Sequence, residues 1–341
     1  MNVLIIRLSA MGDVAMTVPV VASFAKKYPN ANITMVSNPR FEDMFHGINN
    51  LTFFGVDTKN KYKGFGGIFK LFSDLSATEK FDVVIDLHDV LRSKVMRALF
   101  RIKGVKVFKI DKGRAEKKAL TAKEGKVLKQ LKSSVERYRD VFAEAGVPFD
   151  LTFDSLMQKG TPLSANLAET LGEKHGKWIA IAPFAQHQGK IYPLDKMETV
   201  VKLLSEEPDT KVLLFGGGAK EKTVLEDWEK KYGNTISLAG KFPLLQELEI
   251  LNHADTLVSM DSANMHLASL VGTRVVSVWG ATHTCAGFYG FGQNPADTVE
   301  LQMDCRPCSI YGNKPCKFND YRCMTNIEPE TIVNKVLKLN V

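Results

Sequence analysis

Short apolar runs alternate with helix-like segments along the first half of the chain. Residues 2–8 (NVLIIRL) are almost wholly apolar, which is typical of a strand buried on both faces. Residues 14–27 then show apolar positions at helical spacing. Further strand-like runs occupy residues 33–37, 51–56, 83–87 and 105–110. Strands that alternate with helices predict a parallel sheet covered on both faces.

The alternation stops and restarts near the middle of the chain. Prolines and glycines interrupt it between residues 146 and 176, where we expect a linker. Strand-like runs then resume at residues 178–182, 211–215, 256–259 and 274–279, and helical spacing returns at 329–339. A chain of 341 residues also exceeds what one hydrophobic core usually supports. We therefore predict an α/β protein with two doubly wound parallel-sheet domains, at residues 1–165 and 176–325, closed by a C-terminal helix at 326–341.

The composition indicates where in the cell the protein is located more clearly than what it does. No run approaches the roughly 18 apolar residues that a membrane span needs, and the start of the chain lacks the charged and apolar regions of a signal peptide, so we expect a cytoplasmic protein. The formal net charge is +7, with lysines dense between residues 103 and 132. Such a segment is either a solvated helix face or an attractive surface for phosphate or anionic lipid.

Four of the five cysteines lie close together near the C-terminus. They are Cys305, Cys308, Cys316 and Cys323, and the first two form a C-x2-C pair. In a reducing compartment this grouping fits a structural zinc site, although only the first spacing is typical of one. Packed, unliganded thiols are the alternative.

Ligands of doubly wound sheets bind beyond the carboxyl ends of the strands, so the loops that follow strands are the places to look for function. The first such loop runs from Ser9 to Asp13. Gly12 permits close approach of a ligand, and the next helix offers unpaired N–H groups to an anion. Judged locally, Asp13 is a helix N-cap. The loop is not a dinucleotide-binding fingerprint, because G-x-G-x-x-G is absent.

Each of two further loops contains one ionisable residue that is a candidate for ligand binding. Lys190 lies in the polar loop at 183–193 and is suited to meeting phosphate oxygens, although an ordinary exposed lysine is the alternative. Glu221 follows three consecutive glycines at 216–218, which leave room for a nucleotide, and its carboxylate suits sugar hydroxyls. A plain strand-to-helix turn accounts for the glycines nearly as well.

The fourth loop opens a helix that runs toward residue 270. Asp261 is a natural N-cap there, and the backbone N–H groups of Ser262, Ala263 and Asn264 suit a diphosphate. His266 lies one turn further on. A histidine at that place is either a packed core residue or a ligand contact.

Together these loops resemble the ADP-heptose:lipopolysaccharide heptosyltransferase family, glycosyltransferase family 9. The resemblance rests on VLIIRLSAMGDVAMTVPVV near the start, on DSANMHLASLVGTRVVSVWGAT in the second half, and on DLHDVLRS, FGGGAKE, the Lys190 loop and the CRPC…C…CM pattern. It extends along nearly the whole chain. Phe184 and Ala263 stand where glycine is common in the family.

The resemblance implies a GT-B fold, with two Rossmann-like domains facing a central cleft, and it implies roles for individual residues. Asp13 is then the catalytic base rather than a mere cap. The implied acceptor-binding residues are Ser9, Gly12, Arg92 and Lys94. The implied donor-binding residues are Lys190, Glu221, Asp261, Ser262, Ala263 and His266. Basic residues after strand 83–87, namely Arg92, Lys94, Arg97 and Arg101, would suit an acidic acceptor and an anionic membrane surface. The alternative is a helix whose long side chains simply face water.

The function so implied is inverting transfer of a heptose or related sugar from an ADP-sugar donor to the lipopolysaccharide inner core, at the inner face of the inner membrane. No D-x-D motif occurs, so we expect no metal and no cofactor, with Lys190 and the helix after Asp261 stabilising the leaving group. The alternatives are a transferase for another nucleotide sugar or a dinucleotide-dependent oxidoreductase, whose glycine fingerprint is missing. Nucleic-acid binding fits the charge but not the loops, and we expect none.

Overall fold

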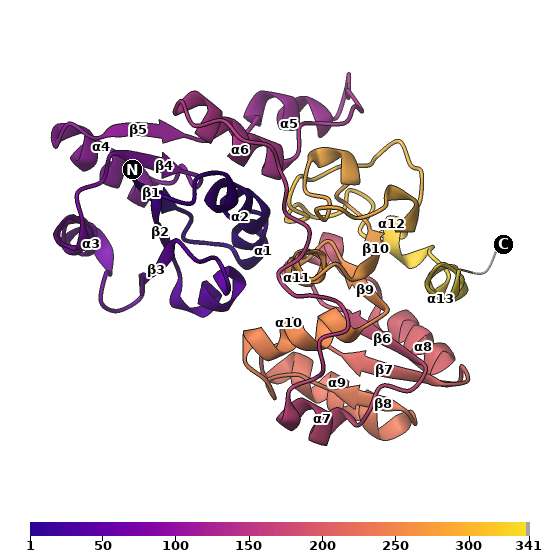
Figure 1. The fold of residues 1–341 in the computed structure, drawn as a ribbon. Coiled ribbons are helices and arrows are strands. Elements are labelled where there is room, and N and C mark those ends of the chain that lie inside the picture. Colours follow the sequence, from indigo (N-terminus) through magenta and orange to yellow (C-terminus); the bar gives the residue numbers. More distant parts are fainter. Residues whose placement is uncertain (339–341) are drawn as a thin grey trace. The chain divides into compact units, whose positions relative to one another are not determined.

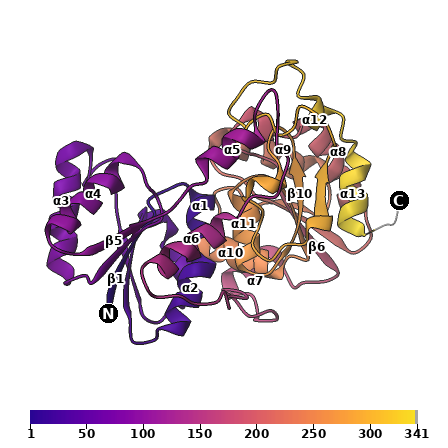
Figure 2. The ribbon, with the colours of Figure 1, turned by 90° about the horizontal axis from the view of Figure 1, so that it is seen from above.

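The computed structural model describes residues 1–338, and the chain divides into two compact units. Unit 1 comprises residues 1–112 and 132–156, and unit 2 comprises residues 113–131 and the chain from 157 onward. Each unit contains one parallel sheet with helices on both faces (Figures 1 and 2). The predicted α/β fold with two doubly wound domains is confirmed.

The sheet of unit 1 has the strand order β3-β2-β1-β4-β5, and all its pairs are parallel. Its strands are β1 (Asn2–Ile6), β2 (Asn32–Ser37), β3 (Leu51–Gly55), β4 (Val83–Asp86) and β5 (Lys106–Lys109). Residue Val3 of the central strand pairs with Ile33 on one side and Val83 on the other. All five strands lie where the apolar runs predicted them.

Two layers of helices cover this sheet. The helices are α1 (Met11–Ala15), α2 (Val18–Lys27), α3 (Gly64–Thr78), α4 (Leu91–Ile102) and α6 (Ser134–Glu144), with a 3-10 helix η1 at Pro39–Phe45. Helices α3 and α4 pack on one face through Leu71 and Phe100, against Leu4 and Val84 of the sheet. Helices α2 and α6 pack against each other and belong to the other layer.

The single helix predicted at residues 14–27 is wrong in one respect, because the chain breaks it into α1 and α2. The hydroxyl of Thr17 donates to the carbonyl of Val14 at 2.6 Å. Pro19 lies in the first turn of α2, where its missing N–H costs nothing. The proline therefore starts a new helix instead of continuing the first one.

The sheet of unit 2 has the order β11-β10-β9-β6-β7-β8 and is also parallel throughout. Its strands are β6 (Lys177–Ala182), β7 (Thr210–Leu214), β8 (Thr235–Ser237), β9 (Thr256–Met260), β10 (Arg274–Trp279) and β11 (Thr298–Glu300). The two outermost strands, β8 and β11, were not predicted. Each has three residues, which is too short for an apolar pattern to be recognised.

The helices of unit 2 also form two layers. They are α5 (Arg114–Leu120), α7 (Ala165–Leu171), α8 (Leu194–Ser205), α9 (Ala219–Lys231), α10 (Leu244–His253), α11 (Ala263–Leu270), α12 (Arg322–Thr325) and α13 (Pro329–Leu337), with 3-10 helices η2 (Gln188–Lys190), η3 (Thr284–Ala286) and η4 (Pro295–Asp297). Helices α8, α9 and α13 share one core, whereas α10 and α11 pack together. Helix α7 lies inside the segment predicted as a linker. Among residues 1–338, no helix has both the length and the apolar character needed to cross a membrane.

The division into units differs from the predicted first domain, 1–165, because residues 113–131 and 157–165 belong to unit 2. In the first of these segments the N–H of Leu131 donates to the carbonyl of Cys285 at 2.9 Å. The predicted C-terminal helix is present as α13, and it packs on α8 within unit 2. Residues 339–341, the end of that predicted helix, lie outside the described residues.

Both sheets share one topological feature that determines where ligands can bind. In unit 1 the chain builds β1, β2 and β3 in one direction and then returns to place β4 on the other side of β1. In unit 2 the same reversal falls between β6 and β9. The loops after two adjacent strands diverge at such a switch point and leave a crevice at the carboxyl ends.

The start of β6 provides a test of backbone packing. At Gly176, which has φ +66°, an added Cβ would lie 2.0 Å from the carbonyl oxygen of Asp209, whereas at Gly160, with φ +81°, it would meet no atom within 4 Å. Both sites carry the strain of a left-handed alanine, about 1–2 kcal/mol. We expect Gly176→Ala to lower the free energy of unfolding more than Gly160→Ala does, by about 1–3 kcal/mol, as measured by urea denaturation. Equal losses would contradict the register of β6 and β7.

Candidate active site

The switch point of unit 1 holds a buried arginine paired with Asp13. Arg7 follows β1 and is 6% exposed. Its Nη2 lies 2.6 Å from Oδ2 of Asp13, and its Nη1 donates to the carbonyl of Leu87, after β4, at 2.7 Å. The guanidinium also lies over the ring of Tyr138 on α6, 5.8 Å from the centroid. Arg7 therefore links the loops after β1 and β4 and orients the Asp13 carboxylate.

Asp13 is not the N-cap that the local pattern predicted. It is the third residue of α1, whose N-cap is Ala10, and its Oδ2 accepts the Ala10 N–H at 3.4 Å. A carboxylate at this position still favours the helix by receiving an N–H and facing the positive end of the dipole. Both contacts use Oδ2, so among residues 1–338 the other oxygen, Oδ1, is left for a ligand. The side chain is 36% exposed.

His88 lies beside this pair, in the loop after β4. Its Nδ1 accepts the N–H of Leu8 at 3.3 Å. Burial, together with the positive charges of Arg7 and Lys112, lowers the pKa of His88 to about 3. The imidazole is therefore neutral near pH 7, and its Nε2 carries the proton because Nδ1 acts as the acceptor.

A second ionic cluster, built on Asp86 at the end of β4, holds this loop in place. Oδ1 of Asp86 accepts the N–H groups of His88 and Asp89 at 2.8 and 2.9 Å. Arg97 of α4 approaches Asp86 at 3.3 Å and Asp89 at 3.0 Å, and all three side chains are buried. The expectation that Arg97, like Arg92, Lys94 and Arg101, meets an acidic acceptor or a membrane surface is therefore wrong, because Arg97 is buried and paired inside unit 1. Two buried carboxylates require a cation, because unpaired burial of charge is costly.

The acceptor-binding residues implied by the resemblance are distributed over two loops of unit 1. Ser9 is exposed in the loop after β1, and Gly12 lies in the first turn of α1. Arg92 donates through Nη1 to the carbonyl of Tyr62 at 2.6 Å, which fastens the start of α4 to the segment before α3. Lys94 is exposed on α4. Only Ser9 and Gly12 share a loop with Asp13.

The switch point of unit 2 brings together two of the predicted donor residues. Lys190 follows β6 at the end of η2, and Asp261 directly follows β9. Lys190 Nζ lies 2.8 Å from Asp261 Oδ2, with side chains 16% and 5% exposed. Two residues far apart in the sequence thus form a largely buried ion pair at the carboxyl ends of adjacent strands. A phosphate arriving there would compete with Asp261 for the lysine.

Helix α11 begins beside this pair, one residue later than predicted. Its N-cap is Ser262, not Asp261, and the Ser262 hydroxyl lies 3.1 Å from that of Ser259 instead of capping the helix. Ala263 is the first helical residue, so the unpaired N–H groups belong to the turn it opens. His266, one turn further, is 6% exposed. Asp261 is thereby freed from capping to pair with Lys190.

Glu221 stands at the neighbouring strand end, in the first turn of α9 after β7. Its Oε2 accepts the N–H of Gly217 at 2.7 Å, which closes the glycine loop onto the helix. Gly216 lies against Phe184 from the Lys190 loop, since a Cβ there would be 3.4 Å from the ring. Glu221 thus shapes the loop as well as presenting a carboxylate.

The four-cysteine segment supports the Lys190 loop. A Cβ at Gly312, between Cys308 and Cys316, would lie 2.6 Å from Cγ of Lys190. All four cysteines are free thiols, and burial raises the pKa of Cys323 to about 11. Within residues 1–338, no group of three or more His, Cys, Asp or Glu side chains is arranged to hold a metal ion. Cys323 belongs to the core beneath α8 and α13, whereas Cys305, Cys308 and Cys316 are only partly buried.

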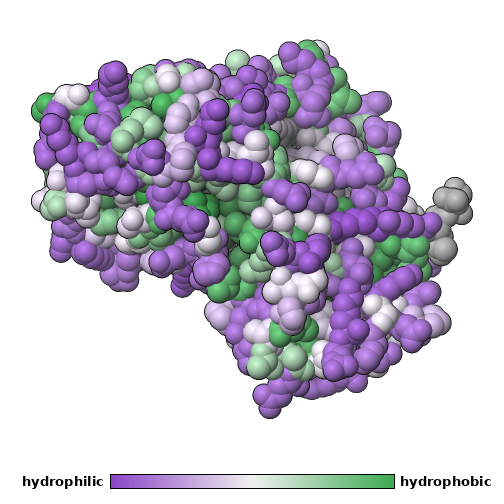
Figure 3. Space-filling model, in the orientation of Figure 1, coloured by the Kyte–Doolittle hydropathy of each residue, from purple (hydrophilic) through white to green (hydrophobic). Residues whose placement is uncertain are grey.

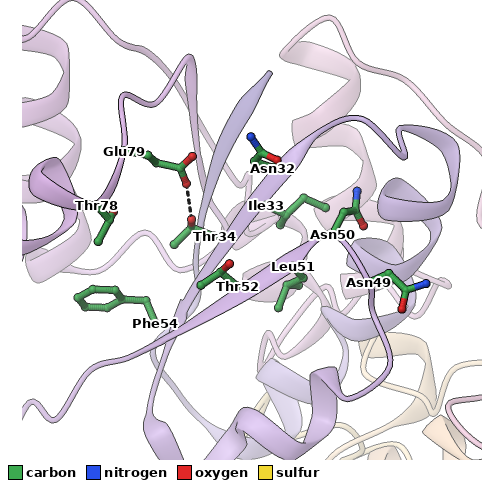
Figure 4. Close-up of a pocket in the computed structure, with 10 residues that line it drawn as sticks. All are labelled: Asn32, Ile33, Thr34, Asn49, Asn50, Leu51, Thr52, Phe54, Thr78 and Glu79. Carbon is green, nitrogen blue, oxygen red and sulfur yellow. Dashed lines mark hydrogen bonds between the residues drawn. The ribbon is translucent and has the colours of Figure 1, made fainter.

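A separate pocket of about 430 Å³ lies at the opposite edge of the unit 1 sheet, at the start of β2 and β3 (Figure 4). Several of its polar groups already bind one another or the backbone. Thr34 donates to Glu79 at 2.7 Å, and the Asn50 amide donates to the carbonyls of Tyr28 and Ala31. We assign it no ligand, because the ionic groups that could carry chemistry lie at the carboxyl ends.

Comparison with known proteins agrees with this arrangement. The family model for glycosyltransferase family 9 (heptosyltransferase) matches residues 68–317. Lipopolysaccharide heptosyltransferase 3 of Escherichia coli (strain K12) is 27% identical over 292 residues, which cover 80% of each chain. A family 9 glycosyl transferase from Veillonella parvula superimposes with a TM-score of 0.73 at 18% identity, covering 99% and 97% of the two chains. E. coli heptosyltransferase WaaC with ADP-2-deoxy-2-fluoro heptose gives a TM-score of 0.66 at 18% identity, with full coverage of both chains.

Together with the family match, two parallel-sheet α/β domains of this kind identify a glycosyltransferase of the GT-B fold class. The family model matches well over half of the chain, and the chain therefore belongs to glycosyltransferase family 9. The matched range contains the Lys190–Asp261 pair but begins after Asp13.

Two residues of the unit 1 site were not identified from the sequence as site residues. Arg7 lies in the quoted motif RLSAMGD and His88 in DLHDVLRS. A positive charge at the end of an otherwise apolar strand is the signal that marks Arg7, because a buried arginine needs a buried partner. No local signal distinguishes His88, whose neighbours come from β1 and from the segment after β5.

Because His88 is neutral in the folded chain, the stability of the protein should depend on pH in a specific way. Its pKa is about 3 in the folded chain against an ordinary value of 6.5, so lowering the pH from 7 to 5 protonates the unfolded chain but not the folded one. Stability contributed by neutral His88 is present above pH 6.5 and is lost as the pH falls. Asn retains an acceptor for the Leu8 N–H but does not titrate. We expect the parent to lose about 2 kcal/mol more than His88→Asn between pH 7 and pH 5. Parallel losses in urea denaturation would contradict a neutral, buried imidazole.

Proposed function

We propose that this enzyme transfers a heptose, or a closely related sugar, from an ADP-sugar donor to the inner core of lipopolysaccharide, with inversion at the anomeric carbon. The observation that carries the proposal is the Lys190–Asp261 pair beside the first turn of α11 at the switch point of unit 2. It combines a cation, a carboxylate and helical N–H groups, which suit a diphosphate that is joined to a sugar. The E. coli relative is named a lipopolysaccharide heptosyltransferase, and WaaC was solved with an ADP-heptose analogue.

On this proposal unit 2 binds the donor. Lys190 exchanges its contact with Asp261 for a phosphate oxygen, and the N–H groups of Ser262, Ala263 and the turn they open receive the rest of the diphosphate. Asp261 and His266 then face the sugar, and Glu221 the nucleoside. A cation that is already positioned stabilises the charge that develops on the departing diphosphate without reorganisation. No metal or other cofactor is needed in this scheme.

Unit 1 supplies the base and binds the acceptor. The acceptor hydroxyl attacks the anomeric carbon of the donor, while the bond from that carbon to the diphosphate oxygen breaks and ADP leaves with the electron pair. The hydroxyl proton passes to Oδ1 of Asp13, whose other oxygen is held by Arg7. Ser9 and Gly12 line the same loop, and Arg92 and Lys94 provide positive charge for a phosphorylated core.

The acceptor of such a reaction is lipid-linked, so we further propose that the enzyme works at the cytoplasmic face of the inner membrane, by peripheral association. Exposed positive charge on unit 1 supports this, since Lys94 and Arg101 lie on the outer side of α4.

Replacing Asp13 by asparagine separates the catalytic role from the capping role. Asparagine retains an acceptor for the Ala10 N–H but cannot take the acceptor proton. We expect turnover at saturating substrates to fall at least about 100-fold, with donor affinity unchanged. A modest loss of thermal stability should accompany it, because Arg7 loses its ionic partner. Product formation from ADP-heptose is followed by mass spectrometry.

The control is Asp57→Asn, another unit 1 aspartate whose carboxylate accepts the N–H groups of Lys59 and Asn60 in a turn. It should leave turnover unchanged. If Asp13→Asn retains turnover within a few-fold of the parent, Asp13 is not the base.

Replacing Lys190 by alanine tests the donor site. We expect donor affinity to fall at least about tenfold and turnover to fall as well, because a contact to the diphosphate strengthens as the leaving group departs. The variant also leaves Asp261 buried without its cation. Lys190→Ala/Asp261→Asn removes that charge, so it should recover stability but not donor binding. Lys196→Ala, which breaks a 3.2 Å pair with Glu328 in the same unit, is the control. Unchanged donor affinity by calorimetry would exclude Lys190 from the site.

A further inference from the structure

Helices α3 and α4 expose large apolar side chains that the core of unit 1 does not use. Phe65 and Phe69 on α3 are 60% and 49% exposed, and Leu91 and Ile102 on α4 are 69% and 84% exposed. The inner faces of the same helices are filled by other residues, including Ile68, Leu71, Met96 and Phe100. Single exposed apolar residues are ordinary, but four on two adjacent helices form a surface.

The two helices pack against each other and turn their inner faces to the same core, so their exposed residues lie on the same side of unit 1. Figures 1 and 2 show the two helices. At the start, Arg92 of α4 donates to the carbonyl of Tyr62, just before α3. At the other end, the ammonium group of Lys103 lies over the ring of Phe72, 4.9 Å from its centroid. The rings of Phe65 and Phe69 are 6.2 Å apart. Figure 3 shows apolar residues among polar ones over this part of unit 1.

The charges around these apolar residues are almost all positive. Segments 61–78 and 91–103 contain eight lysines and arginines and one acidic residue, Asp74. Asp74 is already paired with Lys61 at 3.2 Å and receives the hydroxyl of Tyr62 at 2.8 Å. Of the basic residues, only Arg97 is buried and neutralised internally. The exposed ones include Lys63, Lys70, Lys94, Arg101 and Lys103.

We infer that the surface formed by α3 and α4 docks on an anionic phospholipid bilayer. Phenylalanine, leucine and isoleucine side chains bury apolar area at the boundary between headgroups and acyl chains, while surrounding lysines and arginines meet lipid phosphates. A nucleic acid would satisfy the charges but leave the aliphatic residues in water, and a neutral apolar partner would leave the charges unpaired. This inference rests on the proposed function in one respect: docking on the membrane would bring the enzyme to a lipid-linked acceptor.

Flotation with lipid vesicles tests the inference without requiring sugar transfer. The full chain should float with vesicles of phosphatidylcholine and phosphatidylglycerol but not with phosphatidylcholine alone. Phe65→Ser/Phe69→Ser should weaken this binding on the order of tenfold or more, because it removes the apolar contribution and keeps every charge. Val127→Ser/Leu128→Ser is the matched control, since these residues are 49% and 55% exposed in another lysine-rich segment, and it should bind like the parent.

A second measurement, of tryptophan fluorescence, shows whether the α3–α4 surface enters the lipid when the protein binds vesicles. The native Trp178, Trp228 and Trp279 are buried, so a tryptophan introduced as Phe65→Trp provides most of any change in emission. Its emission should shift to shorter wavelength with anionic vesicles. The inference is overturned if the parent fails to bind anionic vesicles, if the Phe65/Phe69 variant binds like the parent, or if the control loses binding equally.

Transfer to a deacylated, water-soluble acceptor distinguishes this inference from the proposed function. Phe65→Ser/Phe69→Ser should transfer to that acceptor at the parent rate. Absence of transfer by the parent would reject the proposed function while leaving the vesicle result to stand by itself.

Discussion

The position of the strand-order reversal is the constraint on which the rest of this structure depends. In each unit the chain winds its sheet outward from one central strand and then returns to the other side of it, so two loops diverge at the carboxyl ends of adjacent strands. Arg7 and Leu87 meet at the first of these points, and Lys190 and Asp261 at the second. Groups far apart in the sequence become neighbours because parallel strands end at the same edge.

Charges at both points are held in place before any substrate arrives. Arg7 is buried and bound on two sides, so it holds one oxygen of Asp13 and leaves the other available. In unit 2 the Lys190–Asp261 pair has only small exposed fractions. An ion pair removed from water is not a large source of stability, since the desolvation cost offsets much of the attraction. Its value to an enzyme is orientation, because a charge already in place need not be rearranged during the reaction.

The charged residues at each switch point are held by contacts from segments that lie far away in the sequence. The Asp86–Arg97–Asp89 cluster fixes the loop that carries His88, and its arginine comes from α4, the helix whose outer side is exposed. In unit 2, Gly312 lies against the aliphatic part of Lys190, so the cysteine-containing segment supports the Lys190 loop. In both units a distant element restrains the residues at the switch point.

The sequence by itself determined the fold class, nine of the strands and the loops that carry Asp13, Lys190, Glu221 and Asp261, because apolar periodicity and strand-end position are local properties. It did not determine which residues pair. The break between α1 and α2, the short strands β8 and β11, the placement of residues 113–131 and the burial of Arg97 depend on contacts between distant segments. The same holds for His88, whose neutral state arises from burial and from Arg7 and Lys112 on other elements. Only the tertiary structure decides such features, because burial and charge pairing are set by residues that the chain brings together from different strand ends.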